Sequence, residues 1–279
     1  MKIGFIGAGK VGFSLGKYFK NNNLNVIGIY SRNYINGEEA SKFIDIKHFY
    51  TIEEIVSKCD IIFLTVSDKS IVEVWNKIKE LNINNKIICH CSGALSSSVF
   101  KDIEHLGAWG YSLHPVISIN SKLESYKNLK DTYFTLEGST AKLNIIKGLI
   151  KQLDNKLIEI TQENKNLYHC AAVFSSNFIV ALAQISIDLL KRCGFKEEDC
   201  SILFPLMESS IKNIMNDGTV NALTGPIERC DIETVNKHLL CINYNEKKMY
   251  KLLSKELVKL AAIKNPNINY DRLKTIIKE

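Results

Sequence analysis

Paired cysteines are missing from this sequence of 279 residues, and their absence bears on both metal binding and redox compartment. No two of the eight cysteines form a CxxC pair, so the sequence predicts no zinc site and no other metal centre. Most of them lie inside apolar runs. We therefore expect free, buried thiols in a reducing compartment. The eight are Cys59, Cys89, Cys91, Cys170, Cys193, Cys200, Cys230 and Cys241.

Long apolar runs and concentrated basic segments are also lacking. No run approaches the roughly 18 apolar residues of a membrane span, and the chain opens on a strand pattern rather than a leader segment. The net charge of +6 comes from lysines scattered over the chain, with no basic segment that also carries aromatic residues. We expect a cytoplasmic protein with no membrane and no nucleic-acid partner. A mild positive field suits an anionic substrate and cofactor.

The order of the apolar segments indicates two domains. Up to residue 160, short runs without polar alternation are separated by helical patterns, which is typical of a parallel sheet covered on both faces. The expected strands are 2–6, 25–30, 48–50, 61–66, 86–91, 109–113, 132–136 and 156–160. Only helices follow, among them a helix over 164–193 that is apolar on nearly every side and a helix over 197–215 with a kink at Pro205. The sequence predicts an α/β Rossmann domain over 1–160 and an all-α domain over 161–279.

A glycine-rich segment follows the first expected strand and precedes a helix. It reads Gly7-Ala8-Gly9-Lys10-Val11-Gly12. In this context the first glycine permits a tight turn, the second lets the backbone approach a pyrophosphate, and the third lets helix and strand pack closely. The pyrophosphate then lies at the helix N-terminus, where free amides favour negative charge. The segment predicts a dinucleotide site.

The end of the second expected strand indicates which dinucleotide binds. A carboxylate is usual there when the site takes NAD, because it accepts a hydrogen bond from the ribose 2′-hydroxyl. Here the chain has Ser31 and Arg32 instead. A hydroxyl and a guanidinium suit a 2′-phosphate, so we expect NADP(H). The alternative for Arg32 is a solvated surface side chain.

Three further strand ends are expected at the same edge of the sheet. Val66 and Ser67 follow the fourth strand and should flank the ribose and nicotinamide. Ser92 and Gly93 follow the fifth strand, where Ser92 either binds cofactor and substrate or caps the helix that follows. His114 lies in a loop that Pro115 keeps rigid, and it either contacts substrate or is structural.

The helical half carries two groups of candidate substrate ligands. Lys165, His169 and Asn177 lie on one stripe of the long apolar helix. We expect either Lys165 or His169 to donate a proton to a carbonyl oxygen, with Asn177 orienting the substrate. The alternative is hydrogen bonding within the core. Thr224 and Arg229 flank a Thr-Gly-Pro turn and could hold a carboxylate, or belong to an ordinary loop.

These motifs together resemble one bacterial family over nearly the whole chain. They are GxGxxG, His90-Cys91-Ser92-Gly93-Ala94, His114-Pro115, Tyr168-His169-x-Ala-Ala with Ser-Asn, and Thr-Gly-Pro-x-x-Arg-x-Asp. Its members join a Rossmann domain to a helical domain of formerly unknown function and are distant relatives of pyrroline-5-carboxylate reductase and of the 6-phosphogluconate and hydroxyisobutyrate dehydrogenases. The resemblance implies a 6-phosphogluconate-dehydrogenase-like C-terminal domain, NADPH, hydride transfer to a small 2-oxo acid, and a homodimer joined through the helical domains.

Some family members resemble an alternative ketopantoate reductase, so the expected reaction is reduction of ketopantoate to pantoate, a precursor of pantothenate. Two alternatives stay open. One is an imine reductase of the pyrroline-5-carboxylate reductase type, and the other is a redox sensor that binds NADP(H) without turnover. The chain departs from its dehydrogenase relatives where they carry Lys-x-x-x-Asn, because His169 stands at the asparagine position. It also has Cys230 where the final turn usually has glycine.

Overall fold

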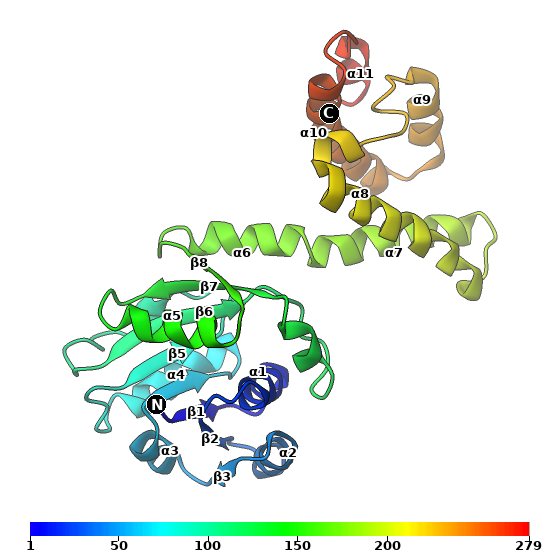
Figure 1. Cartoon of the computed structure of the whole chain (residues 1–279). Coiled ribbons are helices and arrows are strands. Elements are labelled where there is room, and N and C mark those ends of the chain that lie inside the picture. Colours follow the sequence, from blue (N-terminus) through cyan, green and yellow to red (C-terminus); the bar gives the residue numbers. More distant parts are fainter. Residues whose placement is uncertain (279) are drawn as a thin grey trace. The chain divides into compact units, whose positions relative to one another are not determined.

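The computed structural model describes residues 1–278 and divides into two compact units, Met1–Val180 and Ala181–Glu279 (Figure 1). Each unit is described by itself. The predicted boundary after residue 160 stays a prediction. The helix that follows this boundary belongs with the first unit by its contacts, although its apolar pattern resembles that of the later helices.

The first unit is built on one eight-stranded sheet in the order β3-β2-β1-β4-β5-β6-β7-β8. The strands are β1 (Ile3–Ile6), β2 (Val26–Tyr30), β3 (Lys47–Phe49), β4 (Ile61–Leu64), β5 (Ile87–His90), β6 (Trp109–Pro115), β7 (Tyr133–Gly138) and β8 (Lys156–Glu159). The strands from β1 to β6 are parallel to one another, and β8 is parallel to β7. This is the predicted Rossmann sheet, with the strand order reversing between β1 and β4.

The prediction of a wholly parallel sheet is wrong at one place, because β7 runs antiparallel to β6. The segment joining them holds only a short 3₁₀ turn, η2 (Ser125–Leu129). A parallel return usually needs a crossover helix. The strand β6 also extends through His114 and Pro115, so these two residues lie in the sheet and not in the expected loop. Val116, just after them, donates from its backbone to Tyr133 at 2.8 Å, which continues the ladder.

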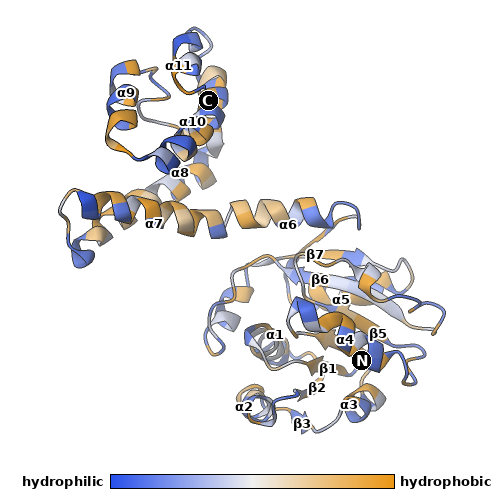
Figure 2. Ribbon diagram, turned by 180° about the vertical axis from the view of Figure 1, so that it is seen from behind, coloured by the Kyte–Doolittle hydropathy of each residue, from blue (hydrophilic) through white to orange (hydrophobic). Residues whose placement is uncertain are grey.

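Helices cover both faces of the sheet and bury two apolar cores (Figures 1 and 2). One face packs against α1 (Lys10–Asn21), α2 (Tyr34–Ile44) and α5 (Leu143–Gln152), and its core includes Phe13, Phe19 and Ile150. The other packs against α3 (Ile52–Lys58) and α4 (Asp68–Ile78). Their buried side chains recur at helical spacing, which explains why the apolar pattern predicted these helices.

The long apolar helix is interrupted. The structure has α6 (Lys165–Phe174) and α7 (Asn177–Arg192) separated by a turn at Ser175 and Ser176. Both serine hydroxyls donate to the Ala172 carbonyl, at 3.1 and 2.6 Å. Such bonds compete with the helix ladder. The expected single helix over 164–193 is therefore corrected to two.

The stretch Lys165–Arg192 is long and apolar enough to cross a membrane by length and composition alone. The expectation that no run approaches that length is therefore wrong on this measure. Figure 2 shows apolar residues along most of α6 and α7. Leu167, Phe174 and Val180 are 72%, 63% and 70% exposed, so these side chains are not covered within the chain.

The second unit is helical, with η3 (Glu197–Leu203), α8 (Phe204–Ala222), α9 (Ile232–Cys241), α10 (Tyr244–Lys264) and α11 (Asp271–Ile276). The kink expected at Pro205 is wrong. Pro205 lies in the first turn of α8, where its missing N–H costs nothing. The break in α8 occurs at Gly218, which has φ of 75°. Glycine adopts this conformation without strain because it has no Cβ. A small core holds the unit together, with Val235, Val258 and Leu273 at its centre.

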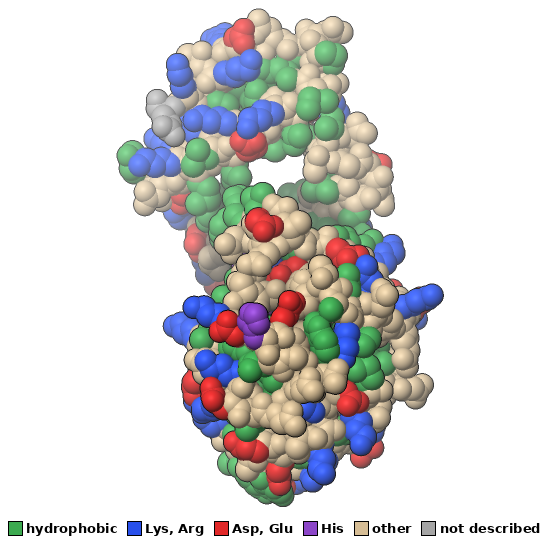
Figure 3. All heavy atoms as spheres, turned by 90° about the vertical axis from the view of Figure 1, so that its left-hand side faces the viewer, with side chains coloured by type: hydrophobic (Ala, Val, Ile, Leu, Met, Phe, Trp, Pro, Cys, Tyr) green, Lys and Arg blue, Asp and Glu red, His purple; other side chains and the backbone are tan. Residues whose placement is uncertain are grey.

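The cysteines are unpaired as expected, but only some of them are buried. All eight cysteines are free within residues 1–278, and Cys59, Cys89, Cys91 and Cys200 are buried. Cys170, Cys193 and Cys241 are exposed, which corrects the expectation of burial. Charged side chains of both signs are interspersed over the face shown in Figure 3.

Candidate functional site

The glycine loop joins β1 to α1 and is shaped by contacts with the end of β4. Gly7 has φ of 117°, and a Cβ there would lie 2.7 Å from the Thr65 backbone. A Cβ on Gly12 would lie 2.1 Å from the Gly7 oxygen. Thr65 Oγ1 donates to that same oxygen at 2.7 Å. Two of the three glycines are thus required by the protein's own packing.

Gly9 differs from the other two glycines. The nearest atom to a Cβ placed there would be the Thr65 oxygen at 3.7 Å, which is ordinary contact. No atom of residues 1–278 therefore requires glycine at this position, whereas a ligand that lies against the loop would. Gly9 is also the N-cap of α1, with no capping side chain and no acidic residue in the first turn. The first-turn amides around Lys10 and Val11 are open to an anion.

A cavity of about 360 Å³ lies beside this loop, at the edge where the strand order reverses. Its lining includes the predicted Gly7, Ala8, Gly9, Ser31, Arg32, Val66 and Ser67. Arg32 is exposed, and within residues 1–278 no hydrogen bond or ion pair holds its guanidinium. The one carboxylate in the lining, Glu73, accepts from Lys77 at 3.3 Å. The cavity fits a dinucleotide phosphate group, because its walls include glycine backbone, hydroxyls and a free guanidinium beside apolar side chains such as Ile52 and Val74.

A second group of polar residues gathers where β5 and β6 end, and Lys165 is at its centre. Lys165 is the first residue of α6 and is only 1% exposed. Its Nζ donates to Ser112 Oγ on β6 at 2.7 Å. Burial lowers the pKa of Lys165 to about 8, and Glu137 is the first of the groups that oppose this shift. The ammonium form therefore predominates at neutral pH while holding its proton less firmly than a solvated lysine.

Two histidines lie on either side of Gly93. A Cβ on Gly93 would be 2.6 Å from His169 Nδ1 and 2.9 Å from His114 Nε2. His114 Nδ1 and the Tyr168 hydroxyl share a hydrogen bond of 2.7 Å. Burial lowers the pKa of His114 to about 4, and the charge of Lys165 lowers it further, so this ring is neutral at pH 7. His169 Nδ1 is buried without a hydrogen-bond partner in residues 1–278. Such an orphaned atom is expected where a ligand binds.

Ser92 shapes the loop beside these histidines. Its Oγ accepts from the amides of Ala94 and Leu95 at 3.2 and 3.0 Å, and its own amide donates to His90 Nδ1 at 3.2 Å. These bonds hold the loop itself, and the short 3₁₀ turn that follows has Ser96 as its N-cap, so Ser92 does not cap a following helix. His90 is fully buried, and burial lowers its pKa to about 4.

Asn177 is not part of this cluster. It starts α7, is exposed, and its Oδ1 accepts from Ser176 Oγ at 3.1 Å. Eight residues separate it from His169, which along a helix is about 12 Å. The expected common stripe is also interrupted by the turn between α6 and α7.

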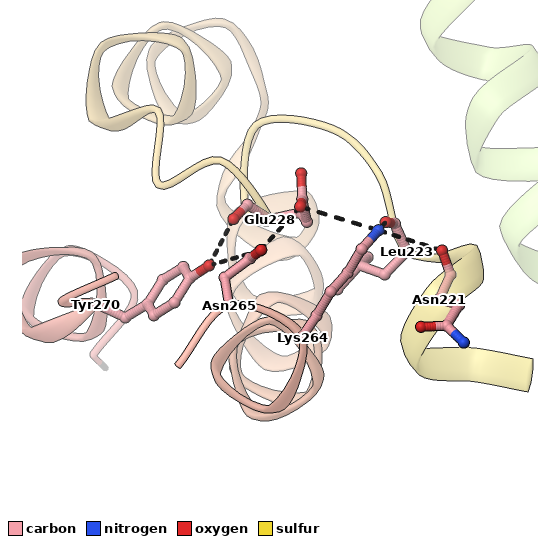
Figure 4. A network of polar contacts seen from close by, with 6 residues as sticks. All are labelled: Asn221, Leu223, Glu228, Lys264, Asn265 and Tyr270. Atoms are coloured by element: carbon pink, nitrogen blue, oxygen red, sulfur yellow. Dashed lines mark hydrogen bonds and ion pairs between the residues drawn. The ribbon is translucent and has the colours of Figure 1, made fainter. Parts of the chain in front are cut away.

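Thr224 and Arg229 belong to the second unit, on the segment between α8 and α9. Figure 4 shows how this segment is held. Lys264 Nζ donates to the Asn221 and Leu223 carbonyls, and Tyr270 donates to the Glu228 carbonyl at 2.5 Å. Asp231 caps α9, because its side chain accepts from the Thr234 amide. Cys230 has φ of 55°, the left-handed conformation for which glycine would be unstrained. The turn thus forms although glycine is missing.

Sequence reasoning missed three members of the cluster: Ser112, Tyr168 as a partner of His114, and Glu137. Ser112 and Glu137 are polar residues inside apolar strands, and both are buried. A buried carboxylate needs partners, so Glu137 was a signal that the sequence contained. Its partners could not be found, because they depend on the antiparallel pairing of β6 and β7.

Comparisons with known proteins agree with this geometry. A Rossmann-like domain model matches residues 1–115, and the model of a domain of unknown function, DUF2520, matches residues 132–257. No curated protein matches the chain. Protein TM1727 from Thermotoga maritima is 31% identical over 93% of this chain and 96% of its own, with a TM-score of 0.68.

Two other solved structures share the fold at lower identity. Protein BF3122 from Bacteroides fragilis has a TM-score of 0.75 at 21% identity, covering 92% of this chain and 98% of its own. The pyrroline carboxylate reductase of Plasmodium falciparum, solved with NADP bound, has a TM-score of 0.61 at 17% identity and covers 95% and 96%. The chain therefore belongs, with the Thermotoga protein, to the family that joins a Rossmann-like domain to the DUF2520 domain.

Proposed function

We propose that this protein is an NADPH-dependent reductase of a small 2-oxo acid, with ketopantoate as the preferred substrate. The observation that carries the proposal is a buried, proton-bearing Lys165 among histidines at the same sheet edge as the dinucleotide cavity. The structural likeness to a pyrroline carboxylate reductase and an imine reductase, both solved with NADP, supports NADP-dependent reduction in general and not the choice of a 2-oxo acid.

The cofactor half of the proposal rests on the fit of the loop. Gly9 leaves space that only a ligand would use, and the first turn of α1 offers uncapped amides to a pyrophosphate. Ser31 and Arg32 would hold the 2′-phosphate, and Val66 and Ser67 would flank the ribose. When bound, the reduced nicotinamide supplies a hydride to the ketone carbon.

The protein's own contribution is a proton and a polar cradle. Lys165 Nζ has three donors, of which Ser112 takes one. As the ketone oxygen gains charge, the ammonium hydrogen-bonds to it and then transfers a proton, leaving a hydroxy acid and a neutral amine. Because Lys165 is almost fully buried, the partly exposed Tyr168 and His169 side chains must turn aside to admit the substrate. His114 and His169 then border the oxygen.

The charge of the cluster favours a ketone over a cyclic imine. A ketone is neutral and becomes an alkoxide, which a neighbouring ammonium stabilises. The imine substrates of reductases react as cations, and a cation beside Lys165 would be repelled in the ground state.

A substrate panel tests the proposal. NADPH oxidation is followed with ketopantoate, other 2-oxo acids and cyclic imines, and NADH is the control cofactor. Turnover of a 2-oxo acid with NADPH at much higher kcat/KM than with NADH supports the proposal. Turnover of imines alone would contradict the proposal and identify an imine reductase. Tight NADPH binding without any turnover would contradict it in favour of a redox sensor.

We further propose that two chains pair through α6 and α7, so that each covers the other's apolar helix surface. The large exposed side chains on these helices support this, since patches of this kind mark contact surfaces. Analytical ultracentrifugation in detergent-free buffer tests it. A dimer that V180E converts to monomers is expected. A monomer at all concentrations, or sedimentation of the protein only with lipid vesicles, would contradict it.

A further inference from the structure

Three buried polar side chains form a row across the sheet beneath Lys165. His90 on β5 pairs in register with Ser112 on β6, and Ser112 pairs with Glu137 on β7. Residues paired in this way project from the same face of a sheet. All three are buried, Glu137 at 5% exposure. Lys165 Nζ contacts Ser112, the middle member of the row. Glu137 pairs with Ser112 from the neighbouring strand, so it lies beside this contact.

The carboxylate of Glu137 also holds the loop that leaves β5. The Ser97 amide donates to Glu137 Oε1 at 2.5 Å, and the Ser97 hydroxyl donates to Oε2 at 2.8 Å. Ser97 begins the short η1 turn (Ser97–Val99), five residues after Ser92. One carboxylate therefore ties the Ser92–Gly93 loop to β7.

We propose that Glu137 is a positioning residue: it is the buried counter-charge that keeps Lys165 protonated, and it anchors the loop that carries Gly93 between the two histidines. Only the effect of Glu137 on catalysis rests on the proposed function. The electrostatic and structural roles belong to the chain itself and are measurable without cofactor or substrate.

Among the groups around Lys165, Glu137 is the main negative charge that stabilises its ammonium form. Among the groups that raise the pKa of Lys165 against the effect of burial, Glu137 comes first, and Cys91 and Asp68 follow. The Cys91 thiol is buried, and burial raises its pKa to about 12, so it is neutral at pH 7. Two facing histidines, His90 and His114, are neutral for the same reason of burial.

The remaining neighbours do not compete with Glu137. Burial raises the pKa of Tyr168, so its hydroxyl also stays neutral at pH 7, and the Lys165 ammonium lies 5.6 Å from the centre of this ring. His169 borders the cluster from the same helix as Lys165. Asp68 starts α4 and is exposed, so water screens its charge. Loss of the Glu137 charge should therefore lower the pKa of Lys165 directly.

The test is a ¹³Cε NMR titration of the lysines in the apoprotein, with the Lys165 signal identified by its absence in K165R. In wild-type protein this signal should titrate near pH 8. In E137Q, which keeps an oxygen acceptor for Ser97, it should titrate about one pH unit lower. The matched control is E159Q, because Glu159 is an exposed carboxylate on β8 paired with Lys147. It should leave the Lys165 titration unchanged.

If E137Q does not fold, E137D carries the test. Its carboxylate lies one methylene farther back, so the Lys165 pKa should fall by a smaller amount and amide exchange at Ser97 should speed up. An unchanged Lys165 titration in whichever variant folds would overturn the proposal. Because no cofactor or substrate is present, this outcome is independent of whether the protein reduces a 2-oxo acid. If it does, E137Q should also move the alkaline limb of the kcat/KM profile, which reports groups of the enzyme before substrate binds, to lower pH.

Discussion

Replacing Lys165 with methionine separates two effects of the buried charge: its cost to the stability of the fold and its contribution to reductase activity. Burial holds the pKa of Lys165 at about 8 against an ordinary value of 10.5. A difference of about 2.5 pH units corresponds to about 3 kcal/mol of free energy of unfolding. That penalty applies at pH 7, where the unfolded chain carries the charge at no cost. The figure already includes the favourable effect of Glu137, because Glu137 contributes to the pKa itself.

Methionine removes the penalty and also removes the hydrogen bond to Ser112, which contributes about 1 kcal/mol. K165M should therefore be more stable than wild type by about 2 kcal/mol at pH 7. The folded state binds fewer protons than the unfolded state between pH 8 and 10.5, so wild-type stability rises through that window. Above it the penalty is gone and K165M should be less stable by about 1 kcal/mol. The two stability curves must cross.

The assay is urea unfolding at a series of pH values, followed by tryptophan fluorescence. Both tryptophans, Trp75 and Trp109, lie in the unit Met1–Val180, so the signal reports the unit that contains Lys165. K165R is the control, since it keeps a charge that does not titrate in this range. A K165M curve parallel to wild type at every pH, or one that lies lower at pH 7, would refute the reasoning. Reductase activity of K165M should fall to a low residual rate at every pH.

Three further predictions concern the histidines and the cofactor cavity. G93A should lower kcat at least about tenfold with an unchanged Kd for NADPH by calorimetry, because its Cβ displaces His169 and His114; equal kcat would show that the histidines are not needed in place. R32A should weaken NADPH binding roughly 10- to 100-fold and leave NADH binding unchanged, since only the 2′-phosphate contact of about 1.5–3 kcal/mol is lost; equal losses for both cofactors would contradict this assignment. Because burial lowers the pKa of His90 and His114 to about 4, the unfolded state binds more protons between pH 6.5 and 4, and the free energy of unfolding should fall through that window by up to about 3 kcal/mol per histidine. In H114N, urea unfolding at acid pH should show a smaller fall in the free energy of unfolding, by the contribution of one histidine. A fall as large as in wild type would show that His114 does not contribute.

The sequence predicted those parts of the site that depend on local spacing. The strand, glycine turn and helix around Gly9 follow from a short pattern in which each residue has a steric reason. Lys165 and His169 were found because polar residues one turn apart on an apolar helix need partners. The structure brings both to the ends of β5 and β6, as that pattern indicates.

The rest depended on contacts that no local pattern encodes. Glu137 meets the site only because β7 reverses direction, and nothing in its own segment shows that reversal. The break at Ser176 arises from hydroxyls that bond back to the helix, whereas composition indicated one continuous helix. Pro205 was read as a kink because its place in the first turn depends on where α8 begins. Spacing alone also grouped Asn177 with His169, although a turn divides them.

The most direct test of the central claim is the pH profile of NADPH oxidation with the 2-oxo acid that the panel identifies. If Lys165 donates the proton, kcat/KM should be level near pH 7 and fall tenfold per pH unit above about pH 8, where the ammonium of the free enzyme is lost. K165M should show only a low residual rate with no such limb. A flat profile from pH 7 to about 9.5 in wild type, or a K165M rate equal to wild type, would contradict the account.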